Sequence, residues 1–225
     1  LGVECGVVVG QRFHAVLGGN LGEQVTQLGI AWRLERHVVD EVWQLIAGTL
    51  TDGPQTFVRH AGLVRNVPIP SWFYTVRTLF KHLINLMHNS VILVGVMVYY
   101  QVPFTENTWL VIPGLLLVSF NLYWVLHGLG LVGARFRDVE LLLTSLVPLL
   151  FFISPVIYQA NRLPVALNVV WLNPFSYMIE AIRTPLLGSA PDVLTWYVLV
   201  GMLVVGGGLT WLLQRTQGKK IAFWV

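Results

Sequence analysis

The stretch TWLVIPGLLLVSFNLYWVLHGLGLVG, residues 108–133, decides the fold class, because it contains no Asp, Glu, Lys or Arg. A helix needs about 20 mostly apolar residues to cross the hydrocarbon core of a bilayer. Three further runs, at residues 83–101, 139–158 and 193–213, have the same character, and Glu140 is the one charged residue among them. The sequence therefore predicts an all-α integral membrane protein, a helical bundle with four membrane spans.

The composition of the whole chain supports this fold class. Of the 225 residues, 55% are hydrophobic and 11% are charged, and the mean hydropathy is +0.68. Soluble globular domains carry about 25% charged residues. The single cysteine, Cys5, cannot form an internal disulfide. Collagen-like, disordered and disulfide-stabilised classes are therefore excluded.

The basic residues are distributed unevenly about the predicted spans. Most of them lie on one side of the predicted membrane region. The other side has no Lys or Arg in residues 102–107 and two arginines, Arg162 and Arg183, in residues 159–192. The positive-inside rule places the richer side, and with it the C-terminus, in the cytoplasm. Because these residues are dispersed between spans, they indicate topology and not a nucleic-acid surface. The richer side holds Arg59, Arg65, Arg77, Lys81, Arg135, Arg137, Arg215, Lys219 and Lys220.

Residues 159–192 are apolar but are interrupted by prolines, so no piece is long enough to cross a bilayer. The pieces VALNVVWL and SYMIEAIRTPLLG each predict a short helix. We expect a re-entrant or interfacial segment on the outer side, tolerated at membrane depth if it is buried in protein. Glu180 and Arg183 lie three residues apart on one helical face and are predicted to pair, with a catalytic role as the alternative. The prolines are Pro164, Pro174, Pro185 and Pro191.

Residues 59–80 form the connection before the first predicted span, and they mix apolar with basic residues. The Pro-Ile-Pro sequence at 68–70 forces a break in any helix. The pattern predicts an amphipathic element on the cytoplasmic surface. Such an element either anchors at the lipid headgroups, for example through Trp72 and Arg77, or docks a soluble partner.

The sequence contains neither the His-Glu-x-x-His nor the Gly-x-Ser-x-Gly motif of hydrolases, and it contains no complete nucleotide-binding loop. His127 with Asn121 is one of two polar groups in the predicted spans, and interhelical hydrogen bonding is the alternative to a functional role. Phe120 and Trp124 lie one turn apart and would line a passage for sugar rings, with core packing as the alternative. The second polar group is His88 with Asn85 and Asn89.

Several stretches together resemble the permease subunit of ABC-type polysaccharide and O-antigen exporters, the Wzm-type members of the type 2 ABC exporter superfamily. The resemblance runs from about Val42 to Val225 and includes residues 60–89. In chain order, the stretches that carry it are GARFRD at 133–138, FFISPVIY at 151–158, LNPFSYMIEAIRTPLLG at 172–188 and KKIAFWV at 219–225.

This resemblance implies a permease that dimerises, binds two cytoplasmic ATPase subunits and moves a polyprenyl-diphosphate-linked glycan out across the inner membrane of a bacterium. It implies a transporter subunit and not an enzyme, with no cofactor in this chain, because ATP and Mg would bind to the partner. Residues 59–80 would be the ATPase-coupling region, and Phe120, Trp124, Arg135 and Arg137 the substrate path. For the two arginines, ATPase contact and topology anchoring remain alternatives. The candidate coupling residues are Arg65, Pro68, Pro70 and Trp72.

Members of the resembled family have two spans before the coupling region, so the resemblance implies that this chain lacks the first span and keeps a remnant of the second. We accordingly expect residues 1–41 to be an unreliable amino-terminal segment without functional weight, and residues 42–225 to form the transmembrane domain. One alternative is a drug or lipid permease of the same superfamily. Another is a membrane-embedded glycosyltransferase, for which Asp138 and Glu140 are the available acidic pair.

Overall fold

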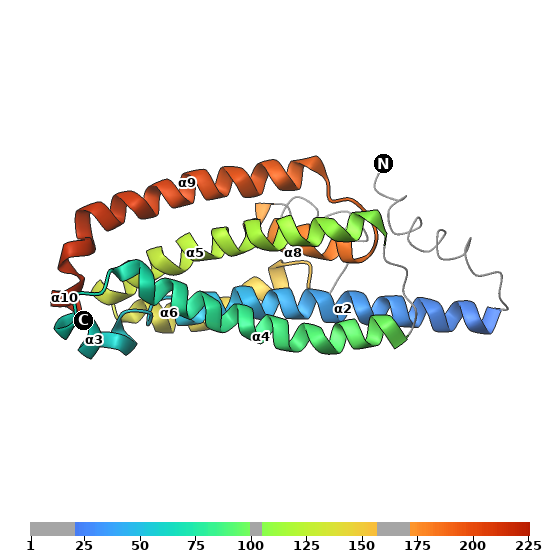
Figure 1. Cartoon of the computed structure of the whole chain (residues 1–225), viewed down its shortest axis with the longest axis horizontal. Helices are drawn as coiled ribbons and strands as arrows, with labels where there is room; N and C mark the ends of the chain where they lie inside the picture. Colours follow the sequence, from blue (N-terminus) through green and yellow to red (C-terminus); the bar gives the residue numbers. More distant parts are fainter. Residues whose placement is uncertain (1–20, 100–104, 157–171) are drawn as a thin grey trace.

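The computed structural model describes residues 21–99, 105–156 and 172–225, and the regular structure within these ranges is helical. The long helices lie side by side along one common direction (Figure 1). In chain order the elements are α2 (Leu21–Asp52), η1 (Val58–His60), α3 (Ala61–Asn66), α4 (Ser71–Tyr99), η2 (Glu106–Leu110), α5 (Val111–Arg135), α6 (Asp138–Ile153), α8 (Pro174–Leu186), α9 (Val193–Gln217), η4 (Gly218–Lys220) and α10 (Ile221–Trp224).

Three of the described helices are long and apolar enough to cross a membrane: Ser71–Tyr99, Glu106–Arg135 and Val193–Gln217. They correspond to three of the four predicted spans. The fourth, predicted at 139–158, corresponds to α6, which ends at Ile153 and is not among these helices. The helix ends there because a proline follows Ser154, and a residue before proline favours an extended backbone. A count of four spans is therefore not confirmed.

Helix α4 begins twelve residues before the span predicted at 83–101. The expected break at Pro68 and Pro70 is confirmed, since the chain is not helical from residue 67 to residue 70. Residues 71–80, however, form the first turns of α4 and not a separate surface element. Arg77 and Lys81 interrupted the uncharged run in the sequence, but both side chains lie on the exposed face and leave the helix intact.

Helix α2 differs most from the expectation, because the boundary predicted after residue 41 falls inside it. Leu34, Val38 and Val39 lie in the expected unreliable segment and are at most 6% exposed. Arg33 and Arg36 are exposed outside this stripe, so an apolar stripe exists without an uncharged run. At least residues 34–41 are thus part of the packed bundle.

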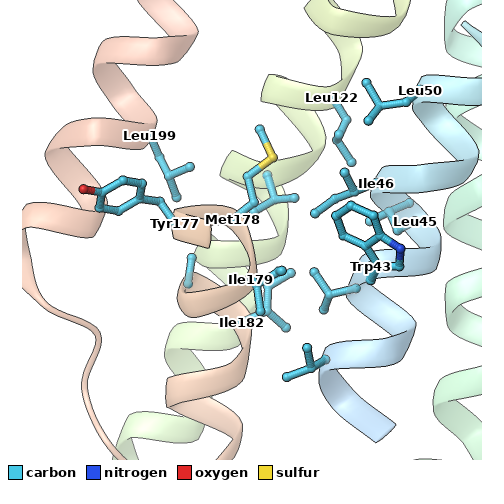
Figure 2. Packing of buried hydrophobic residues seen from close by; sticks show 14 of the residues in the cluster. Trp43, Leu45, Ile46, Leu50, Leu122, Tyr177, Met178, Ile179, Ile182 and Leu199 are labelled. Atoms are coloured by element: carbon cyan, nitrogen blue, oxygen red, sulfur yellow. The ribbon is translucent and has the colours of Figure 1, made fainter. Parts of the chain in front are cut away.

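Helix α5 lies at the centre of the bundle and contacts α9, α8, α4 and α2. Figure 2 shows Met178 of α8 facing Ile46 of α2 and Leu122 of α5, and all three side chains are fully buried. Because lipid is as apolar as leucine, helices in a bilayer associate through close packing and hydrogen bonds. Gly114 permits such close packing: a Cβ there would lie 2.6 Å from the carbonyl oxygen of Ala181 in α8.

Helix α8 confirms the second of the two short helices predicted in residues 159–192. The side chain of Asn173 caps it by accepting a hydrogen bond from the Phe175 amide at 3.1 Å, and Pro174 occupies the first turn. The first predicted piece lies outside the described residues except for Leu172. α8 is largely buried in protein and lies in the half of the bundle away from α3 and α10 (Figure 1).

Candidate functional site

One end of the bundle collects the connection between α2 and α4, the junction of α5 with α6, and the C-terminal helix α10 (Figure 1). Helix α10 contacts both α3 and α5. We call this the basic end and define it as residues 58–72, 135–140 and 218–225. It contains six of the residues predicted for the substrate path or for ATPase coupling, so its geometry is the best test of a functional site.

A small core holds the basic end together. The ring of Phe57 is fully buried and meets the Tyr74 ring edge-on, with 6.3 Å between centroids. Gly130 of α5 makes room for it, because a Cβ there would lie 2.8 Å from the Phe57 ring. Arg65 of α3 donates a hydrogen bond to the backbone oxygen of Val225. The connection is therefore packed against α4, α5 and the C-terminal segment together.

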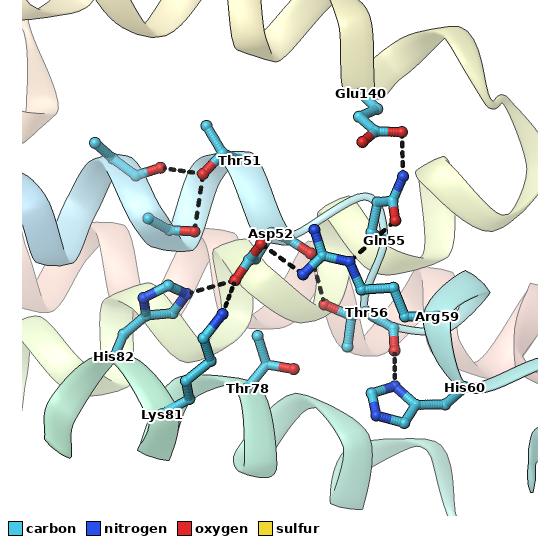
Figure 3. Close-up of polar contacts among 12 residues, drawn as sticks. Thr51, Asp52, Gln55, Thr56, Arg59, His60, Thr78, Lys81, His82 and Glu140 are labelled. Atoms are coloured by element: carbon cyan, nitrogen blue, oxygen red, sulfur yellow. Dashed lines mark hydrogen bonds and ion pairs between the residues drawn. The ribbon is translucent and has the colours of Figure 1, made fainter. Parts of the chain in front are cut away.

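Asp52, the last residue of α2, is the centre of an ionic cluster (Figure 3). Its carboxylate accepts hydrogen bonds from Arg59 at 2.8 Å and Lys81 at 2.9 Å. The Nε2 atom of His82 lies 3.1 Å from the carboxylate, within ion-pair distance but without hydrogen-bond alignment. Burial raises the pKa of Asp52, but the Lys81 hydrogen bond and the nearby charges outweigh burial and hold that pKa below its usual value. The ionised carboxylate thus ties α2 to both the connection and α4.

The same cluster reaches α6 through Gln55. Arg59 donates from Nε to the Gln55 side-chain oxygen at 3.0 Å, and Gln55 donates to Glu140 (Figure 3). Sequence reasoning missed this cluster. The available signal was an acidic residue that ends a helix before Gly53 and Pro54, with a basic residue seven positions later, but no motif marks that spacing.

The surface of the basic end exposes apolar side chains beside cations. Its exposed cations include Arg65, Arg135 and Arg137, and the Arg135 guanidinium lies 5.6 Å from the Trp224 ring centre. Pro68 and Pro70 are exposed in the same connection. The apolar side chains, with their exposed fractions, are Leu63 (44%), Val67 (40%), Trp72 (53%), Phe136 (54%) and Phe223 (88%). Exposed apolar groups gathered in this way are typical of a surface that contacts another molecule.

The two aromatic residues predicted for a substrate path do not share one environment. Trp124 packs over Gly206 of α9 and donates a hydrogen bond to Asn121 at 3.1 Å. Phe120 is 58% exposed and points away from the core. Core packing was the alternative to a sugar passage for these two residues, and it therefore describes Trp124 but not Phe120.

The predicted pair of Glu180 and Arg183 is wrong. Arg183 forms its ion pair with Glu35 of α2, and both side chains are nearly buried, at 13% and 14% exposed. Glu180 accepts a hydrogen bond from Thr184 at 2.6 Å instead. The reason is tertiary: α2 packs against α8 and supplies a carboxylate from the segment that the sequence set aside.

The contacts of His127 confirm the prediction that it forms hydrogen bonds between helices, although Asn121 is not its partner. Its ring nitrogens lie 2.7 Å from the Thr75 hydroxyl of α4 and 3.0 Å from the Gln214 side-chain oxygen of α9. Gln214 in turn donates to Ser71 at 2.8 Å. These contacts join α4, α5 and α9 just inside the basic end.

We expect the Gln214→Leu variant to lose about 1 kcal/mol of stability, because His127 and Ser71 would each lose a partly buried hydrogen-bond partner. The thermal unfolding midpoint of the purified protein in detergent measures this loss. Thr216→Val is the matched control, since Thr216 is exposed and bonds its own helix. A midpoint equal to that of the control would contradict a structural role for the bridge.

No group of three metal-ligating side chains is placed to hold a metal ion within the ranges that the structure describes. Of the acidic pair that the glycosyltransferase alternative would use, Asp138 is exposed and Glu140 is bound to Gln55.

Comparison with known proteins gives two matches. The family described as ABC-2 type transporter matches residues 62–187, more than half of the chain. The O-antigen export system permease protein RfbA of Klebsiella pneumoniae is 25% identical over 146 residues, which cover 63% of this chain and 55% of that protein. The chain thus spans about half the length of the curated relative that it matches.

Proposed function

We propose that this chain, which belongs to the ABC-2 type transporter family, is the membrane permease subunit of an ATP-driven exporter of a polyprenyl-diphosphate-linked, O-antigen-like polysaccharide. Membership makes the chain a membrane subunit of a transporter. The cargo is proposed because the similar Klebsiella protein is an O-antigen export permease. A drug or a lipid is the alternative cargo, since a permease for either would share this topology.

The exposed apolar surface of the basic end is the observation that carries the proposal. The positive-inside rule supports a cytoplasmic location for this end, in the inner membrane of a bacterium. There, Trp72, Phe136 and their neighbours would meet a separate ATP-binding subunit, which would hold ATP and Mg. A second copy of the permease would complete the transport path.

The contacts of the connection suggest how docking would move the spans. A force on η1 acts on Arg59, which is bound to Asp52 at the end of α2. Asp52 is also bound to Lys81 of α4, so α2 and α4 would respond together. Through Gln55 the same force would reach Glu140 at the start of α6. Nucleotide-driven motion of the partner would thus reach three helices through one cluster.

We expect the Trp72→Ala and Phe136→Ala variants each to bind the ATP-binding subunit at least about tenfold more weakly, because exposed aromatic residues are frequent anchors of protein interfaces. Copurification in detergent and titration of the purified subunit measure the binding. Trp109→Ala is the control, because Trp109 is 74% exposed in η2, which precedes the other end of α5. Unchanged binding by both variants would contradict docking at this surface.

The cargo is tested separately, with the permease and the ATP-binding subunit reconstituted together in lipid. Stimulation of ATP hydrolysis by a lipid-linked glycan, and not by lipids or drugs, is the expected result. A pair that forms but responds only to lipids or drugs would reassign the cargo and keep the permease function. A permease that purifies alone would count against ATP-driven export.

A further inference from the structure

The first four turns of α4 carry an open groove of about 480 Å³ that the bundle leaves uncovered. Its walls are mostly apolar, and Phe80 and Ile84 are 57% and 62% exposed. The residues that line it are Phe73, Val76, Arg77, Phe80, Lys81 and Ile84. Two cations therefore stand in an otherwise apolar surface on one helix.

The charges around this groove leave it positive. Arg77 is exposed and forms no ion pair with any residue in the described part of the chain. Lys81 is 64% exposed although it is paired with Asp52, and Arg59 beside it is 50% exposed. Arg59 and Lys81 thus share one carboxylate, whereas Arg77 has none. The three cations Arg59, Arg77 and Lys81 outnumber the two carboxylates even if Glu140, which binds Gln55, is counted with Asp52.

The groove lies where α4 changes from charged to apolar. Lys81 is its last Lys or Arg, and no charged residue follows before Tyr99. A lysine or arginine at such a boundary lies near the lipid phosphates, while the apolar side chains that follow it lie along the acyl chains. Ile84 continues into an exposed face with Met87 and Val91, both at least 68% exposed. A lipid molecule has the matching order of an anionic head and an apolar chain.

We propose that this groove binds an anionic phospholipid of the cytoplasmic leaflet, with its phosphate at Arg77 and Lys81 and an acyl chain along Phe80 and Ile84. The leaflet rests on the orientation proposed above, but the binding itself requires neither ATP nor a glycan. A soluble partner would fit poorly, because the groove runs directly into the membrane-facing surface of α4. A neutral lipid would leave the excess positive charge unmatched.

The test uses the purified protein in nanodiscs of phosphatidylcholine with increasing phosphatidylglycerol, and counts retained phosphatidylglycerol per protein by native mass spectrometry. A basic residue near the membrane surface strengthens binding of an anionic lipid by about fivefold. We therefore expect Arg77→Gln to weaken retention about fivefold and Arg77→Gln/Lys81→Gln about 25-fold. Arg77→Lys should retain most of the binding.

The matched control is Arg215→Gln/Lys220→Gln, which removes two exposed cations from the same end of the molecule. Equal losses in this control and in the groove variant would show a general surface-charge effect and overturn the proposal. Equal retention by all variants would overturn it too. Arg77→Gln removes no ion pair within the described chain, so its thermal midpoint should stay unchanged and its lipid retention remains interpretable.

The lipid phosphate has a second potential source, the diphosphate of a transported polyprenyl carrier. Added undecaprenyl diphosphate distinguishes the two. Failure to displace phosphatidylglycerol at equimolar amounts supports a resident phospholipid, whereas stoichiometric displacement overturns it and assigns the groove to the carrier. Because retention is measured without the ATP-binding subunit, loss of the lipid site and failure of the transport function give different results.

Discussion

Replacing Glu35 with leucine should destabilise the protein by about 3 kcal/mol, because Arg183 would remain as a nearly buried cation without its ion-pair partner. The thermal midpoint in detergent measures this loss. Replacing the whole pair, as Glu35→Leu/Arg183→Met, should recover most of the stability, since apolar residues of similar volume often substitute for a buried ion pair. The double variant therefore separates loss of a charge partner from loss of the fold.

Arg36→Met is the control for the Glu35 prediction, because Arg36 lies one position further along α2 with an exposed side chain. We expect its midpoint to stay near that of the unchanged protein. If Glu35→Leu were equally harmless, the ion pair between Glu35 and Arg183 would contribute nothing to stability.

The sequence predicted the helices that are long and apolar enough to cross a membrane better than the helix that packs beside them. Uncharged runs of sufficient length identified α4, α5 and α9, because a lipid-facing surface tolerates few charges. The first part of helix α2 was missed because Glu35, Asp40 and Glu41 leave it without an uncharged run. A search for uncharged runs cannot detect a helix whose charged face is matched by partners elsewhere in the fold.

The candidate site was predicted in part for a similar reason. The break at Pro68 and Pro70 is local, so backbone geometry alone revealed it. The partner of Arg183 is 148 positions away in the sequence, and local spacing suggested Glu180 instead. The Asp52 cluster likewise depends on Lys81, 29 positions away. Pairings of this kind appear only when the packing of the helices is known.

Gly133→Ala should destabilise the protein by about 1–3 kcal/mol and weaken binding of the ATP-binding subunit, because α5 crosses the connection at this residue. A Cβ on Gly133 would lie 2.4 Å from the backbone oxygen of Pro54 and 2.5 Å from its Cα. Backbone atoms cannot rotate away as a side chain can, so α5 and the turn must separate. Pro54 lies between Asp52 and Gln55, so the shift would reach both members of the ionic cluster.

Gly208→Ala is the matched control for Gly133→Ala, because nothing lies within 4 Å of a Cβ at that position of α9. Alanine favours a helix over glycine by about 1 kcal/mol, so this control should be neutral or slightly stabilising. Gly133→Ala with unchanged stability would contradict the tight contact. Reduced stability with normal binding of the ATP-binding subunit would make Gly133 a packing residue only. If stability and binding of the ATP-binding subunit both decrease, Gly133 sets the distance between α5 and the connection, and coupling depends on that distance.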